Sequence, residues 1–482
     1  MEYVIKGYHP ESVFRFFEEI SAIPRGSYNE SAIADYLVEF AKTRGLEYYR
    51  DQLNNVLIKA PAAQGCEGSP TLMLQGHTDM VCEKNNDVKH DFLRDPLELY
   101  VDGDLLRARG TTLGADNGVA VAAMLALLDG EVKEHPAYEC LFTASEEVGL
   151  DGATGFDYTR ISARHMVNMD SEGLGIVTAG CAGGTRSDLS LSVRTEPFCG
   201  TALRVNLSGL IGGHSGENIN CGRANANKLM GRILAALLPI CDVRIVSIAG
   251  GSKDNAIPRE CEVVLAVPDA DIAMEKVESI ASEIACELVD DDRGFCVTCE
   301  DTEPEGMMLS RDDTARVVAV LACVPNGIME MNREAKGMVE FSRNLGVVRF
   351  DGKQVSFVFA SRSAMESRLD ASTRELDMLA KIIGAETRHY NRYPGWNYAP
   401  ASEVRDAYLD AYRRVTGKDA VVNVIHAGLE CGIIYTNVPG MDVISVGPNI
   451  HDLHSPDESL ELSSMETFWK VIEQLITDWA KR

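Results

Sequence analysis

Short apolar runs separated by longer helical segments mark the first part of the chain. The runs have the length of buried strands, and they lie at residues 71–74, 138–143 and 165–169. The strongly apolar segment 117–129 predicts a helix between the first two of them. Strands that alternate with helices favour a mostly parallel sheet with both faces covered, so this region predicts an α/β domain.

Helix signals occur before this region, and the same α/β pattern returns at the C-terminal end. Two helices and a strand pair are predicted at 10–21, 29–44 and 46–60, and strands and a final helix at 420–425, 442–446 and 465–480. Ser27 with Glu30 matches a capping box, and Gly45 matches the stop of the second helix. Ser463 with Glu466 matches a capping box at the start of the last helix.

The middle of the chain has a different pattern. Apolar and polar residues alternate with a period of two, which predicts half-exposed antiparallel strands. Helices are predicted at 223–239, 271–289, 312–323 and 366–384, in two α+β blocks of similar kind. We therefore expect a mixed, mostly parallel α/β domain in two sequence pieces, 1–185 and 393–482, around an inserted α+β domain at 186–392.

Composition and charge narrow the classes of function. The 482 residues include 46 Lys and Arg against 73 Asp and Glu, a formal net charge of −27 that repels nucleic-acid phosphates and anionic lipid. No run of about 18 apolar residues predicts a membrane span, and no signal-peptide pattern opens the chain. The 13 cysteines, an odd count spread along the chain, indicate free thiols rather than a disulfide framework. We expect a cytoplasmic protein that binds neither nucleic acid nor membrane.

His, Asp and Glu side chains gather in short segments that follow apolar runs or open a helix. These segments are GHTD (76–79), GADNG (114–118), SEEVG (145–149), NMDSEG (168–173) and HDLHSPDE (451–458). In an open parallel sheet, ligands bind beyond the carboxyl ends of the strands. The segments are therefore candidates to face one crevice.

Each of these residues has both a chemical and a structural interpretation. His77 is a candidate metal ligand, and Asp79 would accept a hydrogen bond from its second ring nitrogen. The structural alternative is that His77 caps a loop. Asp116 is suited to bridge two cations or to cap the helix that it precedes. Asp170 and His454 are candidate ligands, and turn residues are the alternative for both.

Glu146 and Glu147 are adjacent at the end of an apolar strand. Such a pair belongs either to a solvated loop or to a site where one carboxylate binds metal and the other remains free as a general base. Taken together, the segments supply two histidines and three carboxylates as ligands, with a spare glutamate. This set suits a two-metal hydrolytic site.

The motifs around these residues resemble those of the M20 metallopeptidase family, in its aminoacyl-histidine dipeptidase (Xaa-His dipeptidase, peptidase D) branch. They are GHTDMVCEKN (76–85), TTLGADNGVAVA (111–122), TASEEVGLDGA (143–153), NMDSEGLG (168–175), GGHSGENI (212–219), GRANA (222–226), KDNAIPRE (253–260) and HSPDE (454–458). The resemblance runs along nearly the whole chain. It implies a zinc-exopeptidase-like catalytic domain with an inserted lid and dimerisation domain.

The resemblance implies a dinuclear metal site. His77, Asp116 and Asp170 would hold one divalent ion, and Asp116, Glu147 and His454 would hold the other, so that Asp116 bridges the two. The first expectation for both ions is Zn²⁺, with Mn²⁺ or Co²⁺ as alternatives, because mixed nitrogen and oxygen ligands accept several divalent ions.

The resemblance also implies roles around the metals. Glu146 would be the general base, Asp79 would orient His77, and the peptide bond after Asp116 would be cis. His214 would stabilise the oxyanion of the scissile carbonyl, commonly from the partner subunit. A loop histidine between flexible glycines is the structural alternative for His214.

Binding of the substrate's C-terminal carboxylate needs a cationic side chain. Arg362 is the first candidate and Arg343 the second, although both also suit surface ion pairs. Asn255 is a candidate for a second polar contact, or a turn residue. His426 and Glu430 lie in a glycine-containing turn that resembles a substrate-side loop of the family, and helix caps are the alternative for both.

We therefore expect a homodimeric dipeptidase that hydrolyses Xaa-His and other short dipeptides, with two metal ions. Another M20-type amide hydrolase, such as an aminoacylase, tripeptidase or carboxypeptidase, is an alternative. A non-catalytic metal-binding homologue is an alternative of a different class. The complete ligand set and the intact Glu146 argue against that last alternative.

Overall fold

The computed structural model describes residues 3–288, 292–303, 306–335 and 337–482. The chain divides into two compact units, each with its own hydrophobic core. Unit 1 comprises residues 1–181, 396–424 and 429–482, and unit 2 comprises residues 182–395 and 425–428. The sequence pattern gives no sign of the short return to unit 2 at 425–428.

Unit 1 is built on an eight-stranded sheet with the order β1-β2-β6-β3-β7-β23-β8-β22. The strands are β1 (Glu47–Arg50), β2 (Val56–Ala60), β3 (Leu72–His77), β6 (Tyr138–Thr143), β7 (His165–Asn168), β8 (Ile176–Cys181), β22 (Val421–Ile425) and β23 (Asp442–Ser445). The neighbours β6, β3, β7 and β23 are parallel, and β1, β2 and β8 join by antiparallel pairing. The predicted mixed sheet with parallel strands is confirmed.

A smaller four-stranded sheet of unit 1 has the order β24-β25-β5-β4. Its strands are β4 (Leu99–Asp102), β5 (Leu105–Ala108), β24 (Ile450–His451) and β25 (Ser459–Glu461). This sheet joins segments that are far apart in the sequence, because β25 pairs with β5. It thereby anchors the loop 452–458, which carries His454, beside the first half of the unit.

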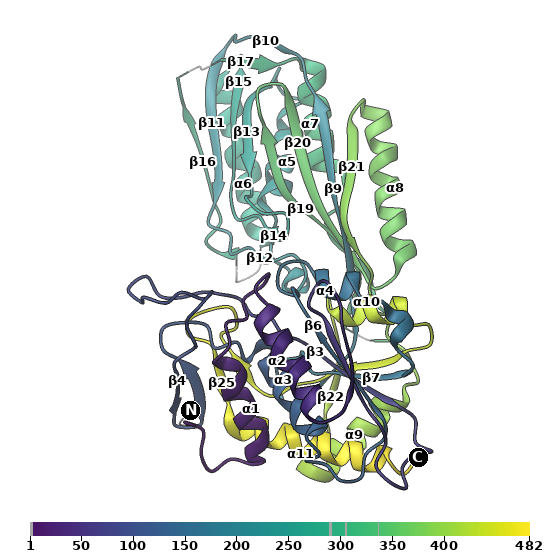
Figure 1. The fold of residues 1–482 in the computed structure, drawn as a ribbon. Helices are drawn as coiled ribbons and strands as arrows, with labels where there is room; N and C mark the ends of the chain where they lie inside the picture. The colour runs from purple at the N-terminus through teal and green to yellow at the C-terminus, as the bar shows by residue number, and fades with distance from the viewer. Residues whose placement is uncertain (1–2, 289–291, 304–305, 336) are drawn as a thin grey trace. The chain divides into compact units, whose positions relative to one another are not determined.

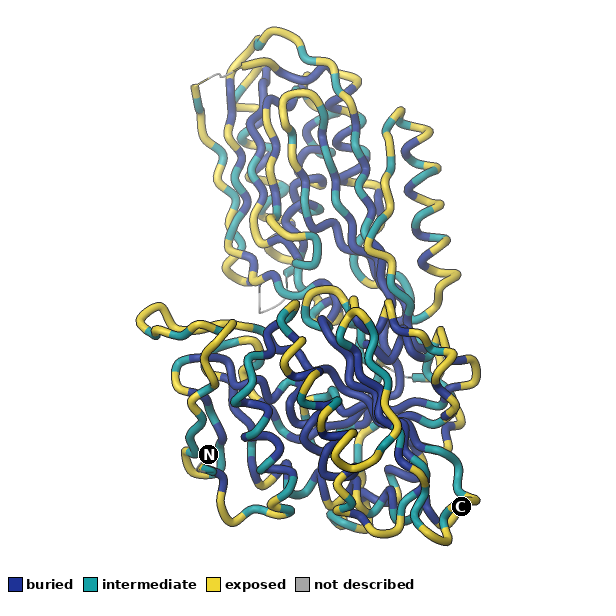
Figure 2. Tube along the Cα trace, viewed as in Figure 1, coloured by how far each residue is buried: buried dark blue, intermediate teal, exposed yellow. Residues whose placement is uncertain are grey.

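The helices of unit 1 pack either on the main sheet or on the helices that cover it (Figure 1). They are α1 (Glu11–Ser21), α2 (Ser31–Thr43), α3 (Ala115–Leu128), α4 (Asp151–Gly155), α9 (Glu403–Thr416), α10 (Glu430–Asn437) and α11 (Leu462–Trp479), with the 3₁₀ turn η1 (Tyr158–Arg160). Helix α3 is buried on almost every side, as expected for a helix that is apolar all round. Figure 2 shows the central strands and α3 as the buried interior of the unit.

Both predicted capping boxes are wrong. Helix α2 has no side-chain cap, because Ser27 donates to the Asp79 carboxylate at 2.8 Å and Glu30 accepts from Ser145 at 2.7 Å. Helix α11 begins at Leu462 rather than after Ser463, whose hydroxyl and backbone N–H both donate to Asp104. In both places, the side chain that local spacing assigns to a helix cap instead hydrogen-bonds to a residue that is distant in sequence.

Unit 2 is built on one sheet with the order β16-β11-β15-β13-β19-β20-β9-β21, and β18 pairs with β19 off this path. Its strands are β9 (Gly183–Ser192), β11 (Thr201–Ser208), β13 (Arg244–Gly250), β15 (Cys261–Val267), β16 (Cys296–Asp301), β18 (Gly327–Met331), β19 (Val339–Phe350), β20 (Gln354–Ser363) and β21 (Glu386–Tyr393). Two small pairs are β10 (Thr195–Pro197) with β17 (Met307–Leu309), and β12 (Gly213–His214) with β14 (Ala256–Ile257).

The helices of unit 2 share one hydrophobic core with this sheet. They are α5 (Ala226–Leu237), α6 (Ala270–Glu287), α7 (Arg311–Cys323) and α8 (Glu366–Ile383), with the 3₁₀ turn η2 (Ile219–Cys221). The strands of the two predicted blocks therefore form one continuous sheet, in which β9, from the start of the first block, pairs with β20 of the second. The predicted end of the second helix, at residue 289, lies outside the described residues. Among the described helices of both units, none is both long and apolar enough to cross a membrane.

Candidate metal centre

The parallel strands of unit 1 bring the predicted ligands to one edge of the sheet. His77 ends β3, Glu146 and Glu147 follow β6, and Asp170 follows β7. These three strands run in the same direction, so their carboxyl ends meet. Asp116 lies in the first turn of α3, which packs against β3.

Three of these side chains form the first candidate ligand group. His77 Nε2 lies 3.0 Å from Asp116 Oδ1 and 3.4 Å from Asp170 Oδ1. One ligand atom from each residue lies within 4.8 Å of the others, which is close enough to hold a metal ion. The peptide bond between Asp116 and Asn117 is cis, as the family resemblance implies.

A second candidate group shares Asp116 with the first. His454 Nε2 lies 3.3 Å from Asp116 Oδ2 and 3.2 Å from Glu147 Oε1. The two oxygens of Asp116 therefore face different histidines, as a bridging carboxylate requires. Glu147 Oε1 is buried and faces His454 Nε2 within this group. Glu146 lies close enough to His77 and Glu147 to form a third, overlapping group.

Close packing of acidic groups shifts the pKa values of this cluster. Burial, reinforced by neighbouring carboxylates, raises the pKa of Glu146 and Asp170 well above the usual range, against the opposing effect of His77. Hydrogen bonds to Asp116 and Glu147 raise the pKa of His454 to about 10. The carboxylates thus favour positive charge at the histidine nitrogens, which is also what makes a site attractive to a divalent cation.

Asp79 connects the two sides of the cluster and is completely buried. Its Oδ1 accepts the backbone N–H of Glu146 at 3.0 Å and lies 3.4 Å from His77 Nδ1. Its Oδ2 accepts from Ser27 at 2.8 Å and from the backbone N–H of Glu147 at 3.3 Å. One carboxylate therefore holds both the ring of His77 and the loop that carries the two glutamates.

Glu458 supports the start of α3 beside the candidate centre, and the sequence analysis did not single it out. Its carboxylate accepts backbone N–H groups from Leu113 at 2.8 Å, Gly114 at 3.0 Å and Ala115 at 2.8 Å. It thus occupies the N-terminus of α3 directly before Asp116, where a negative charge is stabilised. The HSPDE motif contains Glu458, but no local spacing links that motif to residues 113–115.

Two more residues of unit 1 were missed for the same reason. Arg25 is buried and donates to the carbonyls of Thr78 at 3.0 Å and Gly114 at 2.5 Å, so it ties the end of β3 to the start of α3. Glu30 accepts from both the backbone N–H and the hydroxyl of Ser145, next to Glu146. Both belong to the N-terminal segment, whose pattern predicts only helices.

Other predicted residues lie together in unit 2. His214 Nε2 is 3.3 Å from Arg362 Nη2, and Arg362 also donates to the hydroxyl of Tyr393 at 2.8 Å. His426 Nε2 is 2.7 Å from the hydroxyl of Ser342. Burial and the charge of Arg362 lower the pKa of His214, and burial chiefly lowers the pKa of His426 to about 3.

Arg343 does not lie with this group. It neighbours Arg362 across β19 and β20, where Arg362 pairs with Ser342 and Arg343 pairs with Ser361. Successive side chains in a strand point to opposite faces, so Arg343 points away from Arg362. It is buried and donates to Ser372 and Glu375 of α8. These contacts give Arg343 a structural role.

The structure also places the remaining two candidates. Asn255 precedes β14, and its backbone carbonyl accepts from the N–H of Ser215, next to His214. Glu430 opens α10 in unit 1 and is fully buried, where it accepts from Gln75 at 2.6 Å and Thr143 at 2.7 Å. Glu430 therefore has no surface available to a substrate in this conformation.

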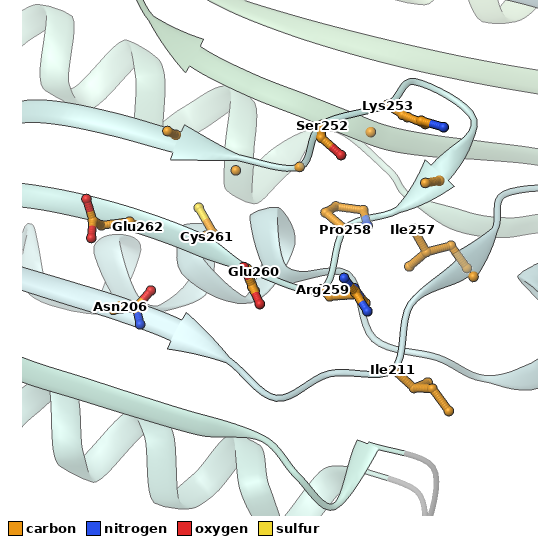
Figure 3. Close-up of a pocket in the computed structure, with 16 residues that line it drawn as sticks. Asn206, Ile211, Ser252, Lys253, Ile257, Pro258, Arg259, Glu260, Cys261 and Glu262 are labelled. Carbon is orange, nitrogen blue, oxygen red and sulfur yellow. The ribbon is translucent and has the colours of Figure 1, made fainter. Parts of the chain in front are cut away.

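A separate cavity of about 680 Å³ lies in unit 2 and is drawn in Figure 3. Its lining includes Lys253, Arg259, Glu260 and Glu262, so its charges are mixed. No residue that the sequence predicts as catalytic, substrate-binding or metal-binding lines it. The candidate chemistry is thus at the strand ends of unit 1 and at the His214–Arg362 pair, not in this cavity.

Comparisons with known proteins identify the family of the chain. A model of peptidase family M20/M25/M40 matches residues 73–478. The cytosol non-specific dipeptidase of Escherichia coli (strain K12) is 37% identical over 473 residues, which is 97% of this chain and 98% of that protein. The crystal structure of aminoacylhistidine dipeptidase from Vibrio alginolyticus is also 37% identical, with a TM-score of 0.93 over 98% of this chain and 97% of that chain.

A more distant structure shares the fold alone. Aminopeptidase PepT from Bacillus cereus is 14% identical, with a TM-score of 0.58 over 98% of this chain and 99% of that chain. The family model covers most of the chain, and the E. coli relative covers nearly all of it. The chain therefore belongs to peptidase family M20/M25/M40.

Proposed function

We propose that this peptidase is a dinuclear metal-dependent dipeptidase that hydrolyses Xaa-His and other short dipeptides. The observation that carries the proposal is the pair of ligand groups that share Asp116, with one carboxylate oxygen toward each histidine. The names of the two relatives that are 37% identical, a non-specific dipeptidase and an aminoacylhistidine dipeptidase, support the substrate class.

The residues present fit two divalent ions. His77, Asp116 and Asp170 would hold one, and Asp116, Glu147 and His454 the other. Mixed imidazole and carboxylate ligands suit Zn²⁺ first, with Mn²⁺ and Co²⁺ as alternatives. When bound, such ions supply Lewis acidity that polarises a peptide carbonyl and lowers the pKa of water.

The chain's own residues account for the proton transfers. Glu146 is left over from the two ligand groups that share Asp116, so its carboxylate is free to act as the general base. It accepts a proton from the attacking water and donates it to the leaving amine nitrogen when the peptide C–N bond breaks. Asp79 positions Glu146 by accepting its backbone N–H and orients the ring of His77.

The substrate-binding group is proposed to lie in unit 2. Arg362 is buried and cationic, and it would pair with the C-terminal carboxylate of the dipeptide. His214 would donate a hydrogen bond to the developing oxyanion. Asn255 and His426 are the further polar groups near this pair.

The cellular location and the oligomeric state of the enzyme are also part of the proposal. We place it in the cytoplasm, in keeping with the cytosolic name of the E. coli relative. Unit 2 is proposed as the lid domain and as the dimerisation domain of a homodimer. A peptide is the only partner class that the site chemistry suggests.

A hydrolysis panel tests the proposed function. The chain, reconstituted with Zn²⁺, Mn²⁺ or Co²⁺ after chelation, is assayed on Xaa-His dipeptides, other dipeptides, tripeptides and N-acyl amino acids. We expect turnover of dipeptides only, and only with metal. Preference for tripeptides or N-acyl amino acids would indicate the other amide hydrolases, and no turnover with full metal content would indicate a non-catalytic homologue.

The variant Glu146→Gln tests the general base. We expect it to retain both metal ions, because Glu146 is not assigned as a ligand, and to lose about 10²–10⁴-fold in kcat, the range for removal of a positioned base. Glu147→Gln is the matched comparison, since the neighbouring carboxylate is an assigned ligand and its loss should reduce metal content. Near-normal kcat in Glu146→Gln would overturn the assignment.

A further inference from the structure

A row of hydrogen-bonded polar side chains crosses the main sheet of unit 1. Gln75 of β3 pairs in register with Asn168 of β7, and Asn168 pairs in register with Ser445 of β23. Asn168 Nδ2 donates to Gln75 Oε1 at 2.6 Å, and the Ser445 hydroxyl donates to Asn168 Oδ1. All three side chains are fully buried. Gln75, Asn168 and Ser445 thus form a continuous polar ladder across three neighbouring strands.

Glu430, the first residue of α10, stands at one end of the polar ladder. Its Oε2 accepts from Gln75 Nε2 at 2.6 Å and from the Thr143 hydroxyl at 2.7 Å. A carboxylate only accepts hydrogen bonds, so it turns the amide nitrogen of Gln75 toward itself and the amide oxygen toward β7. That orientation makes Asn168 the donor to Gln75 and the acceptor from Ser445. One carboxylate thereby orients every side chain of the ladder.

The ladder lies directly behind two candidate metal ligands. Gln75 precedes His77 by two residues, and Asn168 precedes Asp170 by two residues. Residues i and i+2 of a strand point to the same face, so Gln75 and His77 are neighbours on β3. His77 and Asp170 belong to one ligand group, and His77 Nε2 lies 3.4 Å from Asp170 Oδ1. The distance between these two ligands therefore depends on the spacing of β3 and β7, which the ladder spans.

The hydrogen bonds alone do not explain why the end of the ladder is a carboxylate. Glu430 is completely buried, and its Oε1 has no hydrogen-bond partner among the described residues. Burial of such a group costs free energy that a neutral acceptor would avoid. Burial raises the pKa of Glu430 to about 7, and the charge of His77 opposes this shift, so Glu430 lies in the electrostatic field of the candidate centre. Departures of this kind from the rules of stable packing are expected at functional sites.

We infer that Glu430 is a positioning residue of the metal centre. Through the polar ladder it holds the ends of β3 and β7 at the spacing that suits an ion bound by His77, Asp116 and Asp170. This inference rests on the proposed function, which assigns those three ligands to one ion. It gives a role to a buried carboxylate that takes no part in the proposed proton transfers.

The inference predicts a difference between the two ions. The ladder lies on β3, β7 and β23, whereas Glu147 follows β6 and His454 lies in the loop 452–458. Loss of the Glu430 carboxylate should therefore weaken the ion of the first ligand group about 10–100-fold, the usual effect of removing a group that supports a ligand. The affinity for the ion of the second group should change only a few-fold.

Variants that retain one ion each separate the two affinities. His454→Ala removes a ligand of the second ion alone, and Asp170→Ala removes a ligand of the first ion alone. The full-length chain is stripped with a chelator and titrated with Zn²⁺ in a metal buffer, with and without Glu430→Met. We expect Glu430→Met to weaken Zn²⁺ binding about 10–100-fold in the His454→Ala chain and only a few-fold in the Asp170→Ala chain. Any other pattern of losses would overturn the inference.

Glu139→Met is the matched control for removal of a buried carboxylate. Glu139 is 2% exposed and lies in β6, where it accepts from Lys59 and Ser162 and contacts no ladder residue. We expect this variant to lower the free energy of unfolding, as Glu430→Met does, while the folded protein keeps both Zn²⁺ affinities. The same loss of Zn²⁺ affinity in both variants would show a general effect of a damaged core and would refute the positioning role.

Gln75→Met tests whether Glu430 acts through the ladder. It removes the link between Glu430 and Asn168 but leaves the carboxylate in place. We expect the same selective loss of the first ion. Unchanged Zn²⁺ affinity would mean that Glu430 acts by its charge alone, and the inference would be wrong. This variant also decides the question if Glu430→Met does not fold, which circular dichroism shows.

The titrations also distinguish failure of this inference from failure of the proposed function. If the His454→Ala and Asp170→Ala chains each still bind two ions, the assigned ligand groups are wrong, and the inference fails with them. If each chain binds one ion and Glu430→Met changes neither affinity, the ligand groups stand and only the role of Glu430 is refuted.

Discussion

At the scale of single residues, the candidate centre depends on the Glu458 carboxylate, which hydrogen-bonds to the backbone and to no predicted ligand side chain. Glu458 is 2% exposed, and its two oxygens accept backbone N–H groups at the start of α3, one residue before the bridging candidate Asp116. A carboxylate here satisfies N–H groups that the helix itself leaves unpaired. The position of Asp116 is thereby fixed by a residue far away in the sequence.

The variant Glu458→Gln should weaken both folding and metal binding. The amide keeps one acceptor oxygen but aims an N–H₂ group at backbone donors, which costs about 1–3 kcal/mol of stability for an unsatisfied buried group. Displacement of Asp116 should lower metal affinity about 10–100-fold, the usual effect of changing a group that supports a ligand. Thermal unfolding and a metal-buffer titration measure the two effects.

Asp457→Asn provides the matched control for this prediction. It removes the same charge from the same loop, and the side chain of Asp457 makes none of the contacts to the start of α3. We expect near wild-type stability and metal affinity in this control. Equal losses in the two variants would show that the charge of the loop matters and the hydrogen bonds of Glu458 do not.

At the scale of elements, strand direction and strand alternation sort the candidate residues. The parallel ends of β3, β6 and β7 collect His77, the two glutamates and Asp170 at one edge. Alternation along β19 and β20 separates Arg362, the first candidate of the sequence analysis, from Arg343, the second. A pattern of strands thus predicts which segments contribute, and pairing between strands decides which side chains meet.

The turn that precedes α10 supplies a pH-dependent contribution to the stability of unit 2. Burial and the charge of Arg362 lower the pKa of His426 to about 3 from the ordinary value of 6.5. Between pH 3 and pH 6.5 the unfolded chain therefore binds more protons at His426 than the folded chain does. The stability that the neutral, buried His426 contributes is fully present above pH 6.5 and is lost as the pH falls toward 3. His426→Gln should therefore lose less stability than wild type on acidification.

Urea unfolding at neutral and mildly acidic pH measures this difference. We expect the wild-type midpoint to fall more steeply with decreasing pH than that of His426→Gln. His9→Gln, which removes an exposed histidine from unit 1, should follow the wild type. Parallel pH dependence in wild type and His426→Gln would show that His426 does not contribute in this range.

At the scale of the whole molecule, the two units have separate cores and contain different groups of candidate residues. Every predicted metal ligand, together with Glu146 and Asp79, lies in unit 1, and the His214–Arg362 pair lies in unit 2. All three tryptophans, Trp396, Trp469 and Trp479, belong to unit 1. Tryptophan fluorescence, excited selectively over tyrosine, therefore reports on the unfolding of unit 1.

Metal removal should destabilise unit 1 selectively. A ligand that binds only the folded state stabilises it by about 2.7 kcal/mol at a concentration of 100 times Kd. We expect chelation to lower the fluorescence-detected unfolding midpoint, while hydrogen exchange in β19 and β20 of unit 2 stays unchanged. A variant with both His77→Ala and His454→Ala should show no response to metal. Equal loss of protection in both units would contradict this division.

The sequence by itself determines the elements and the chemical inventory of this protein. Apolar runs, turn residues and helical periodicity depend on neighbours in the chain, so the strands around His77, Glu146 and Asp170 and the change of pattern in the middle could be predicted. The motif spacing was sufficient to indicate the family, which the comparisons show. The assignments of metal ligands and base remain predictions.

Only the tertiary structure decided which groups satisfy one another. Ser27, Ser463, Arg25 and Glu458 find partners far away in the sequence, and these contacts override or escape local patterns. The predicted blocks likewise became one sheet through the pairing of β13 with β19 and of β9 with β20. The physical reason is that buried polar groups and strand edges must be satisfied by whatever lies next to them in space, and chain spacing does not encode that proximity.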